Sequence, residues 1–236
     1  MPNRLALKQG HYYHLRNFGA DGRLLFRVTA DRERFLQLLY LCNSSSAVVV
    51  RDIRDKHRLF GKQRGNSLTA IGAYVVLPDS FELVIYEHAQ GGTSRFMQKL
   101  ATGYSMYFNH QYGRSGRIFA GSYRARELVN QSDVVTAIAG VHLASLSRVE
   151  PNWQEEGIAD LLTAERHLAH YAYSSYIDYT KKGSAPIFSQ NIGPSVSSAI
   201  SALRAQATII DFSRFTQAHI ALSRNSFMSH LGVWFV

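Results

Sequence analysis

Two side chains with oxygen atoms suited to metal binding, Ser80 and Glu82, stand two residues apart. A Pro-Asp turn leads into them, between two β-patterned runs at 70–77 and 81–87. Because side chains alternate along a strand, both are expected on one face of the second run. Together with Asp79 they could hold Mg²⁺ or Mn²⁺, which prefer hard oxygen ligands, and Glu82 is the metal candidate. One carboxylate and a neutral hydroxyl are nevertheless a thin ligand set for such an ion.

Arginine is concentrated in one segment without any acid, residues 112–126, which contains Arg114, Arg117, Arg124 and Arg126. Guanidinium groups bind phosphates and guanine edges, and the glycines between them allow close backbone approach. Tyr112 and Phe119 could stack on unpaired bases. This pattern predicts a DNA contact, and the alternative is a solvated turn with a buried Phe119.

Two other segments carry candidate phosphate contacts. Residues 51–66 contain six cations, among them Lys62 and Arg64, against two aspartates, so this stretch is either a phosphate-binding loop or an ordinary solvated one. In the helical pattern that follows residue 93, Arg95 and Lys99 lie away from the apolar face and are free to contact a partner.

The charge balance favours a polyanionic partner. The 236 residues contain 26 Lys and Arg against 17 Asp and Glu, a net charge of +9. The single cysteine, Cys42, excludes an intrachain disulfide framework and a cysteine-based zinc site. No signal peptide and no apolar run of the ~18–20 residues that span a bilayer is visible, so a cytoplasmic, nucleoid-associated protein without membrane contact is expected.

The element order predicts the fold. Strand, helix, two strands, helix, strand and helix follow one another, which is the order of a ferredoxin-like split βαβ sandwich of the α+β class. We expect an antiparallel sheet with helices on one face, within a domain of residues 1–182. Residues 183–236 shift to Ser, Ala and Gly and are expected to form a helical or docking extension.

Several ordered motifs resemble one protein family. They are Gly-His-Tyr-Tyr-His-Leu-Arg-Asn at 10–17, Ser-Met-Tyr-Phe-Asn-His-Gln-Tyr-Gly-Arg-Ser-Gly-Arg-Ile-Phe at 105–119, His-Leu-Ala-Ser at 142–145 and Tyr-Ser-Ser-Tyr at 173–176. The chain thereby resembles the HUH-type single-tyrosine DNA transposases, a group that includes the REP-associated transposase-like proteins. The resemblance covers roughly residues 10–180. It implies binding of hairpin or single-stranded DNA, as a homodimer.

The same resemblance implies that strand cleavage has been lost. Family members hold a divalent metal with a His-hydrophobic-His pair and attack the DNA with a tyrosine, whose phenol has a pKa of ~10 and needs activation. Ser80 and Glu82 stand at the histidine positions, Gly140 at the tyrosine, and Ala144 where a polar helper is expected. No cofactor is therefore expected, and Mg²⁺ or Mn²⁺ only if catalysis survives.

Three hypotheses follow. The first is an inactive DNA-binding relative of these transposases with a regulatory or repeat-binding role. The second is an active single-strand transposase with a relocated tyrosine and a metal site at Glu82. The third is a module that binds an acidic protein. In each of them His142, which sits among apolar neighbours, is interpreted as a structural histidine.

Overall fold

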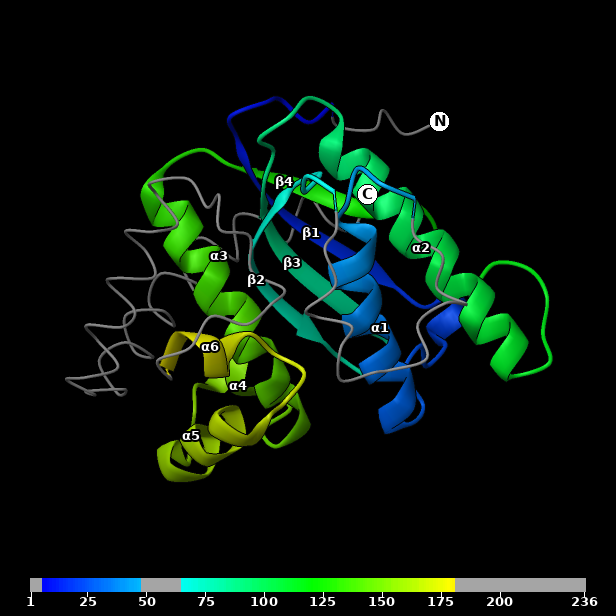
Figure 1. Ribbon diagram of the computed structural model, residues 1–236. Coiled ribbons are helices and arrows are strands. Elements are labelled where there is room, and N and C mark those ends of the chain that lie inside the picture. Colours follow the sequence, from blue (N-terminus) through cyan, green and yellow to red (C-terminus); the bar gives the residue numbers. More distant parts are fainter. Residues whose placement is uncertain (1–5, 48–64, 181–236) are drawn as a thin grey trace.

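The computed structural model describes residues 6–47 and 65–180, and its centre is a four-stranded sheet with helices on either side (Figure 1). In chain order the elements are β1 (Tyr12–Phe18), the 3-10 helix η1 (Ala20–Gly22), α1 (Thr29–Cys42), β2 (Ala70–Val76), β3 (Ser80–Tyr86), α2 (Gly92–Gln111), β4 (Arg124–Leu128), α3 (Gln131–Leu143), the 3-10 helix η4 (Ala144–Arg148), α4 (Trp153–Glu156), α5 (Leu161–His170) and α6 (Tyr176–Thr180). The candidates Lys62 and Arg64 and the predicted extension 183–236 lie outside the described residues.

The sheet has the strand order β2-β3-β1-β4, and every neighbouring pair is antiparallel. β3 therefore separates β1 from β2, the two strands that α1 connects, as a split βαβ unit requires. This confirms the predicted α+β fold with an antiparallel sheet.

The two long helices α1 and α2 cover one face of the sheet. Strand side chains such as Tyr13 and Leu15 join Phe35 of α1 and Phe96 and Tyr104 of α2 in the largest buried cluster. All five side chains are fully buried. The aromatic positions of the α2 segment are therefore part of the core.

The predicted placement of helices on one face is wrong, because α3 packs on the opposite face. Val134 and Ile138 of α3 contact a second buried cluster that includes Val75 of β2 and Val84 of β3. Figure 1 shows the sheet between α3 on one side and α1 and α2 on the other. The physical reason is that β2 is apolar along its whole length, so both of its faces have to be covered.

Behind α3, the short elements η4, α4 and α5 pack around Leu146, Trp153 and Leu168. None of the helices in the described part of the chain combines the length and the apolar character that a bilayer crossing requires.

Candidate nucleic-acid interface

The register of the central strand brings charged side chains together. Arg16 of β1 is paired with Glu82 of β3 on one side and with Arg124 of β4 on the other, and His14 is paired with Arg126. Neighbouring β1 residues Tyr13 and Leu15 point toward α1 and α2, so these charged side chains point to the opposite face.

The apolar contacts of α3 occupy only part of that face. The buried cluster beneath α3 includes Tyr12 of β1 and Leu128 of β4. It includes none of residues 16–18 at the other end of β1. We call the remaining area the basic face and define it by His14, Arg16 and Phe18 of β1 and Arg124 and Arg126 of β4. Arg124 is exposed, and the other four side chains are partly exposed.

Glu82 forms ion pairs with two members of the basic face. Its Oε2 lies 2.7 Å from Nε2 of His14, and its Oε1 lies 3.0 Å from Nη2 of Arg16. Burial alone would raise the pKa of Glu82, but the hydrogen bond and charge of His14 and the charge of Arg16 together lower it. The carboxylate is therefore ionised, and both of its oxygens are occupied, one by the His14 imidazole and one by the Arg16 guanidinium.

These residues do not fit a divalent cation. A metal ion at Glu82 would stand next to the guanidinium of Arg16, where like charges repel. The Ser80 hydroxyl is turned aside, because it donates to Oδ1 of Asp79 at 3.0 Å. Within residues 6–47 and 65–180, no group of three or more His, Cys, Asp or Glu side chains is arranged to hold a metal ion.

The helix at the expected nucleophile position offers no reactive side chain there. Gly140 lies within α3, and a Cβ atom added to it would meet no other atom within 4 Å. Ala144 follows at the end of the helix. Between them, His142 is buried, its Nε2 lies 2.8 Å from Oγ of Ser175, and burial lowers its pKa to about 3. The interpretation of His142 as a structural histidine is confirmed.

The arginine segment between α2 and β4 is anchored by two apolar residues. Ile118 and Phe119 are buried, the Ile118 carbonyl accepts from the Ala20 amide at 2.8 Å, and Phe119 forms a β-bridge with Gly19. Phe119 is only 6 % exposed, so it is not available to stack on a base. On the surface of this anchored loop lie Arg114 and Arg117, both exposed.

Tyr112 takes part in the fold at the end of α2. Its hydroxyl donates to Oδ2 of the buried Asp31 at 2.6 Å, and the guanidinium of Arg27 lies 4.4 Å from its ring centroid. Burial, followed by the hydrogen bond to Asp31, raises its pKa to about 12.

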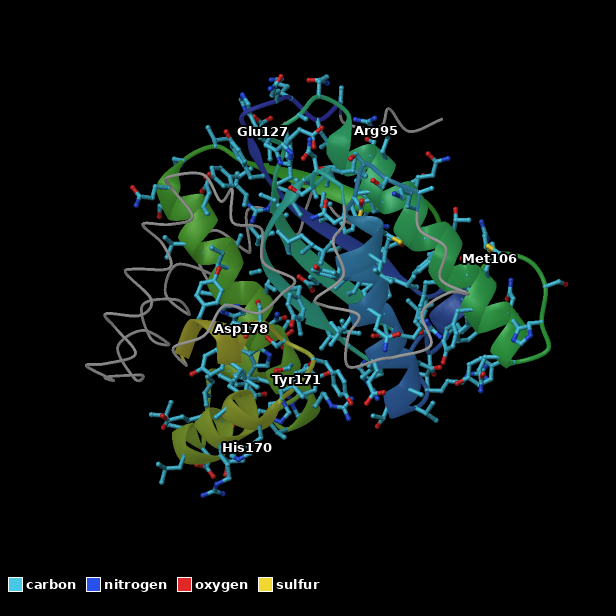
Figure 2. All side chains as sticks on the ribbon, in the orientation of Figure 1. Arg95, Met106, Glu127, His170, Tyr171 and Asp178 are labelled. Atoms are coloured by element: carbon cyan, nitrogen blue, oxygen red, sulfur yellow. The ribbon has the colours of Figure 1, made fainter. Side chains whose placement is uncertain are left out.

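Lys99 and Arg95 lie on α2, across the sheet from the basic face. The Lys99 ammonium donates to the carbonyls of Ser44 and Ser46 at 2.6 and 2.8 Å and so binds the chain just beyond the end of α1. Arg95 is exposed at the beginning of α2 (Figure 2). The structure thus brings Arg124 and Arg126 together on one face and leaves Arg95 and Lys99 on another.

Sequence reasoning missed three members of the basic face, His14, Arg16 and Phe18. A signal for them was present. In a split βαβ sheet the first strand lies beside the strand that carries Ser80 and Glu82, so polar residues with period 2 in both strands will share a face.

Comparisons with known proteins gave distant structural likenesses. No protein-family model matches the chain, and no curated protein matches it. Among solved structures it is similar to a REP-associated tyrosine transposase bound to a REP hairpin, with a TM-score of 0.46, 14% identity and coverage of 81% of this chain and 92% of that chain.

The chain is also similar to a bacterial tRNA(His) guanylyltransferase-like protein. In its complex with ATP the TM-score is 0.38, with 12% identity and coverage of 71% of this chain and 72% of that chain. In its complex with GTP the TM-score is 0.37, with 14% identity and coverage of 66% of this chain and 76% of that chain. All three TM-scores are below 0.5, so the function of this chain has to be inferred from its own residues.

Proposed function

We propose that the protein binds hairpin or single-stranded DNA through the basic face and does not cut it. The observation that carries this proposal is the placement of Arg16, Arg124 and Arg126 on two adjacent strands, on a part of the sheet face that the α3 cluster does not reach within residues 6–47 and 65–180. The carboxylate within the face, Glu82, is already ion-paired, and the exposed Arg114 and Arg117 extend the positive charge onto the neighbouring loop.

Electrostatics of the strand pairing supports an anionic ligand. Arg16 and Arg124 are directly opposite each other, and like charges in such a pair destabilise a sheet. Burial lowers the pKa of Arg126, against the opposing effect of Asp133 at the start of α3. A phosphate bound between these side chains would reduce the repulsion and accept charge-assisted hydrogen bonds.

Phe18 supports a preference for unpaired bases. Its ring is half-buried at the end of β1, and the guanidinium of Arg16 lies 5.2 Å from the ring centroid. A base that stacks on such a ring contributes ~1–3 kcal/mol, and only an unpaired base can reach it. Phe18 therefore replaces Phe119 as the stacking residue in this proposal.

The absence of cleavage is proposed from the residues at the reactive positions. Gly140 has no nucleophile, and Glu82 is held by His14 and Arg16. Of the tyrosines on α2, Tyr104 is fully buried, and burial raises its pKa well above the ordinary value, which makes it a poor nucleophile.

Binding is tested by fluorescence anisotropy with labelled hairpin, single-stranded and duplex oligonucleotides over a range of salt concentrations. We expect Arg124→Ala and Arg117→Ala each to weaken binding several-fold and to flatten the plot of log K against log salt by about 0.7–0.9 per lost contact. The matched control is Arg95→Ala, which removes an exposed arginine from the opposite side of the sheet and should change neither quantity.

Phe18→Leu tests the base contact and should weaken single-strand binding while leaving duplex binding unchanged. No affinity of the wild type at low ionic strength would overturn the proposal and favour an acidic protein as the partner. Cleavage is tested separately with a suicide oligonucleotide and Mg²⁺ or Mn²⁺. A covalent protein–DNA adduct in that assay would show that the protein is an active transposase.

A further inference from the structure

A second group of cationic and aromatic side chains lies at the opposite edge of the sheet. After α5 the chain runs along β2, where the Val76 amide donates to the Tyr173 carbonyl at 2.9 Å and the Ser175 amide donates to the Tyr74 carbonyl at 3.0 Å. The Tyr171 hydroxyl donates to the Val76 carbonyl at 2.7 Å. The two backbone bonds hold the segment against β2, and the third fixes the ring of Tyr171, which Figure 2 shows between α5 and α1.

Three cationic or protonatable groups surround these two rings. From α1, the guanidinium of Arg32 lies 5.3 Å from the ring centroid of Tyr173. From α5, the imidazole of His167 stacks on Tyr171 with the centroids 5.3 Å apart. Arg148, at the end of η4, lies close enough that its charge acts on both Tyr171 and His167.

Two nitrogen atoms of this group have no hydrogen-bond partner in the described part of the chain. Nε of Arg32 and Nε2 of His167 are buried and have no hydrogen-bond partner among the described residues. The ion pairs found in that part of the chain include neither Arg32 nor Arg148. A ligand that accepts from Nε of Arg32, and from Nε2 of His167 when the imidazole is protonated, would supply the missing partners.

We propose that Arg32, Arg148 and His167 form a second binding site, specific for a phosphate group and separate from the basic face. A phosphate oxygen can accept from two guanidinium groups and from a protonated imidazole, and the rings of Tyr171 and Tyr173 form an apolar wall beside it. In the free protein the pKa of His167 is lowered, chiefly by burial and also by the charge of Arg148, against the opposing effect of a hydrogen bond to the Ser145 backbone. A bound anion reverses that effect and favours the imidazolium.

The position of this site decides what it can bind. β2 is an edge strand, two strand spacings (about 10 Å) from β1 and three (about 14 Å) from β4, the two strands that carry the basic face. One phosphate therefore cannot bridge the basic face and the second site, whereas a nucleic-acid strand with several phosphates can. The phosphate could also belong to inorganic phosphate or a free nucleotide.

The test follows the histidine resonances of the full chain by NMR during a pH titration, with sodium phosphate, a mononucleotide or sodium chloride at equal ionic strength. Phosphate should raise the apparent pKa of His167 by about one unit, and chloride should not. Arg148→Gln should abolish the shift, whereas Arg166→Gln, an exposed arginine of the same helix, should leave it unchanged. A His167 pKa that does not respond to either phosphate compound, or an unaltered shift in Arg148→Gln, would overturn the proposal.

Binding of the oligonucleotides used for the basic face distinguishes a DNA backbone phosphate from a free phosphate or nucleotide in the second site. If a DNA backbone occupies the second site, Arg148→Gln weakens oligonucleotide binding and reduces the salt slope by about 0.7, independently of Arg124→Ala. An NMR response with unchanged oligonucleotide binding assigns the site to a free phosphate or nucleotide. Because the NMR measurement uses no DNA, it supports or overturns the second site even if the basic face does not bind DNA.

Discussion

Replacement of Glu82 by glutamine probes the charge pairing at the centre of the basic face. The side chain of Glu82 is 7% exposed, and glutamine keeps its shape but removes the charge that pairs with His14 and Arg16. Breaking a buried ion pair from one side costs about 3–5 kcal/mol. Because the Arg16 side chain is 35% exposed and can turn toward water, we expect a smaller loss of unfolding free energy, about 2–3 kcal/mol.

The pH dependence of this loss has a defined sign. The folded-state pKa of Glu82 lies below its ordinary value of 4.5, so its ionised form contributes stability that is fully present above pH 4.5. That contribution disappears as the pH falls through the lowered folded-state pKa. The difference between wild type and Glu82→Gln should therefore shrink as the pH falls below 4.5.

Urea unfolding at a series of pH values measures the difference, and Glu127→Gln is the matched control. Glu127 also pairs with a histidine of the first strand region, His11, at 2.5 Å, but the two side chains are 24% and 43% exposed. An exposed pair of this kind contributes about 0–1 kcal/mol. The reasoning is refuted if Glu82→Gln destabilises the protein no more than Glu127→Gln, or if its effect grows in acid.

Three further predictions concern residues outside the basic face. Tyr112→Phe removes a hydrogen bond to the buried carboxylate of Asp31 and should cost about 1.5–3 kcal/mol in urea unfolding without a change in DNA affinity. Lys99→Met removes two hydrogen bonds to backbone carbonyls and should cost about 1–2 kcal/mol, again with unchanged binding; weaker binding at equal stability would mean that Lys99 contacts DNA. His142 has a folded-state pKa of about 3 instead of 6.5, so stability should fall by up to about 1.4 kcal/mol per pH unit below pH 6.5, and a His142→Gln variant with the same slope would contradict this.

The periodicity of apolar and polar residues within single segments was sufficient to predict much of the fold. The alternation of β3 correctly placed Ser80 and Glu82 on one face, and the apolar spacing after residue 93 correctly gave the core positions of α2. The continuous apolar run of β2 also contained the information that both sheet faces are covered, but its composition was interpreted only as a strand.

The contacts of the candidate site depend on pairing between distant segments, which a single sequence does not specify. Arg16 belongs to the candidate site because it lies beside Glu82 and Arg124. Only the strand register brings these residues next to it. The sequence predicts Tyr112 as a base-stacking residue because it is an aromatic neighbour of the arginine segment, but its partner Asp31 lies 81 positions earlier in the chain. No local pattern distinguishes a tyrosine that is free from one that binds a distant carboxylate.

The hydrogen bonds that tie Tyr173 and Ser175 to β2 have a consequence for self-association. An unpaired outer strand exposes amides and carbonyls to which another chain can attach, and proteins commonly protect such strands. In this protein the backbone of residues 173–175 covers the outer edge of β2. A homodimer built by joining two sheets into one would therefore have to form along β4, beside Arg124, and would place the arginine-bearing surfaces of both copies next to each other.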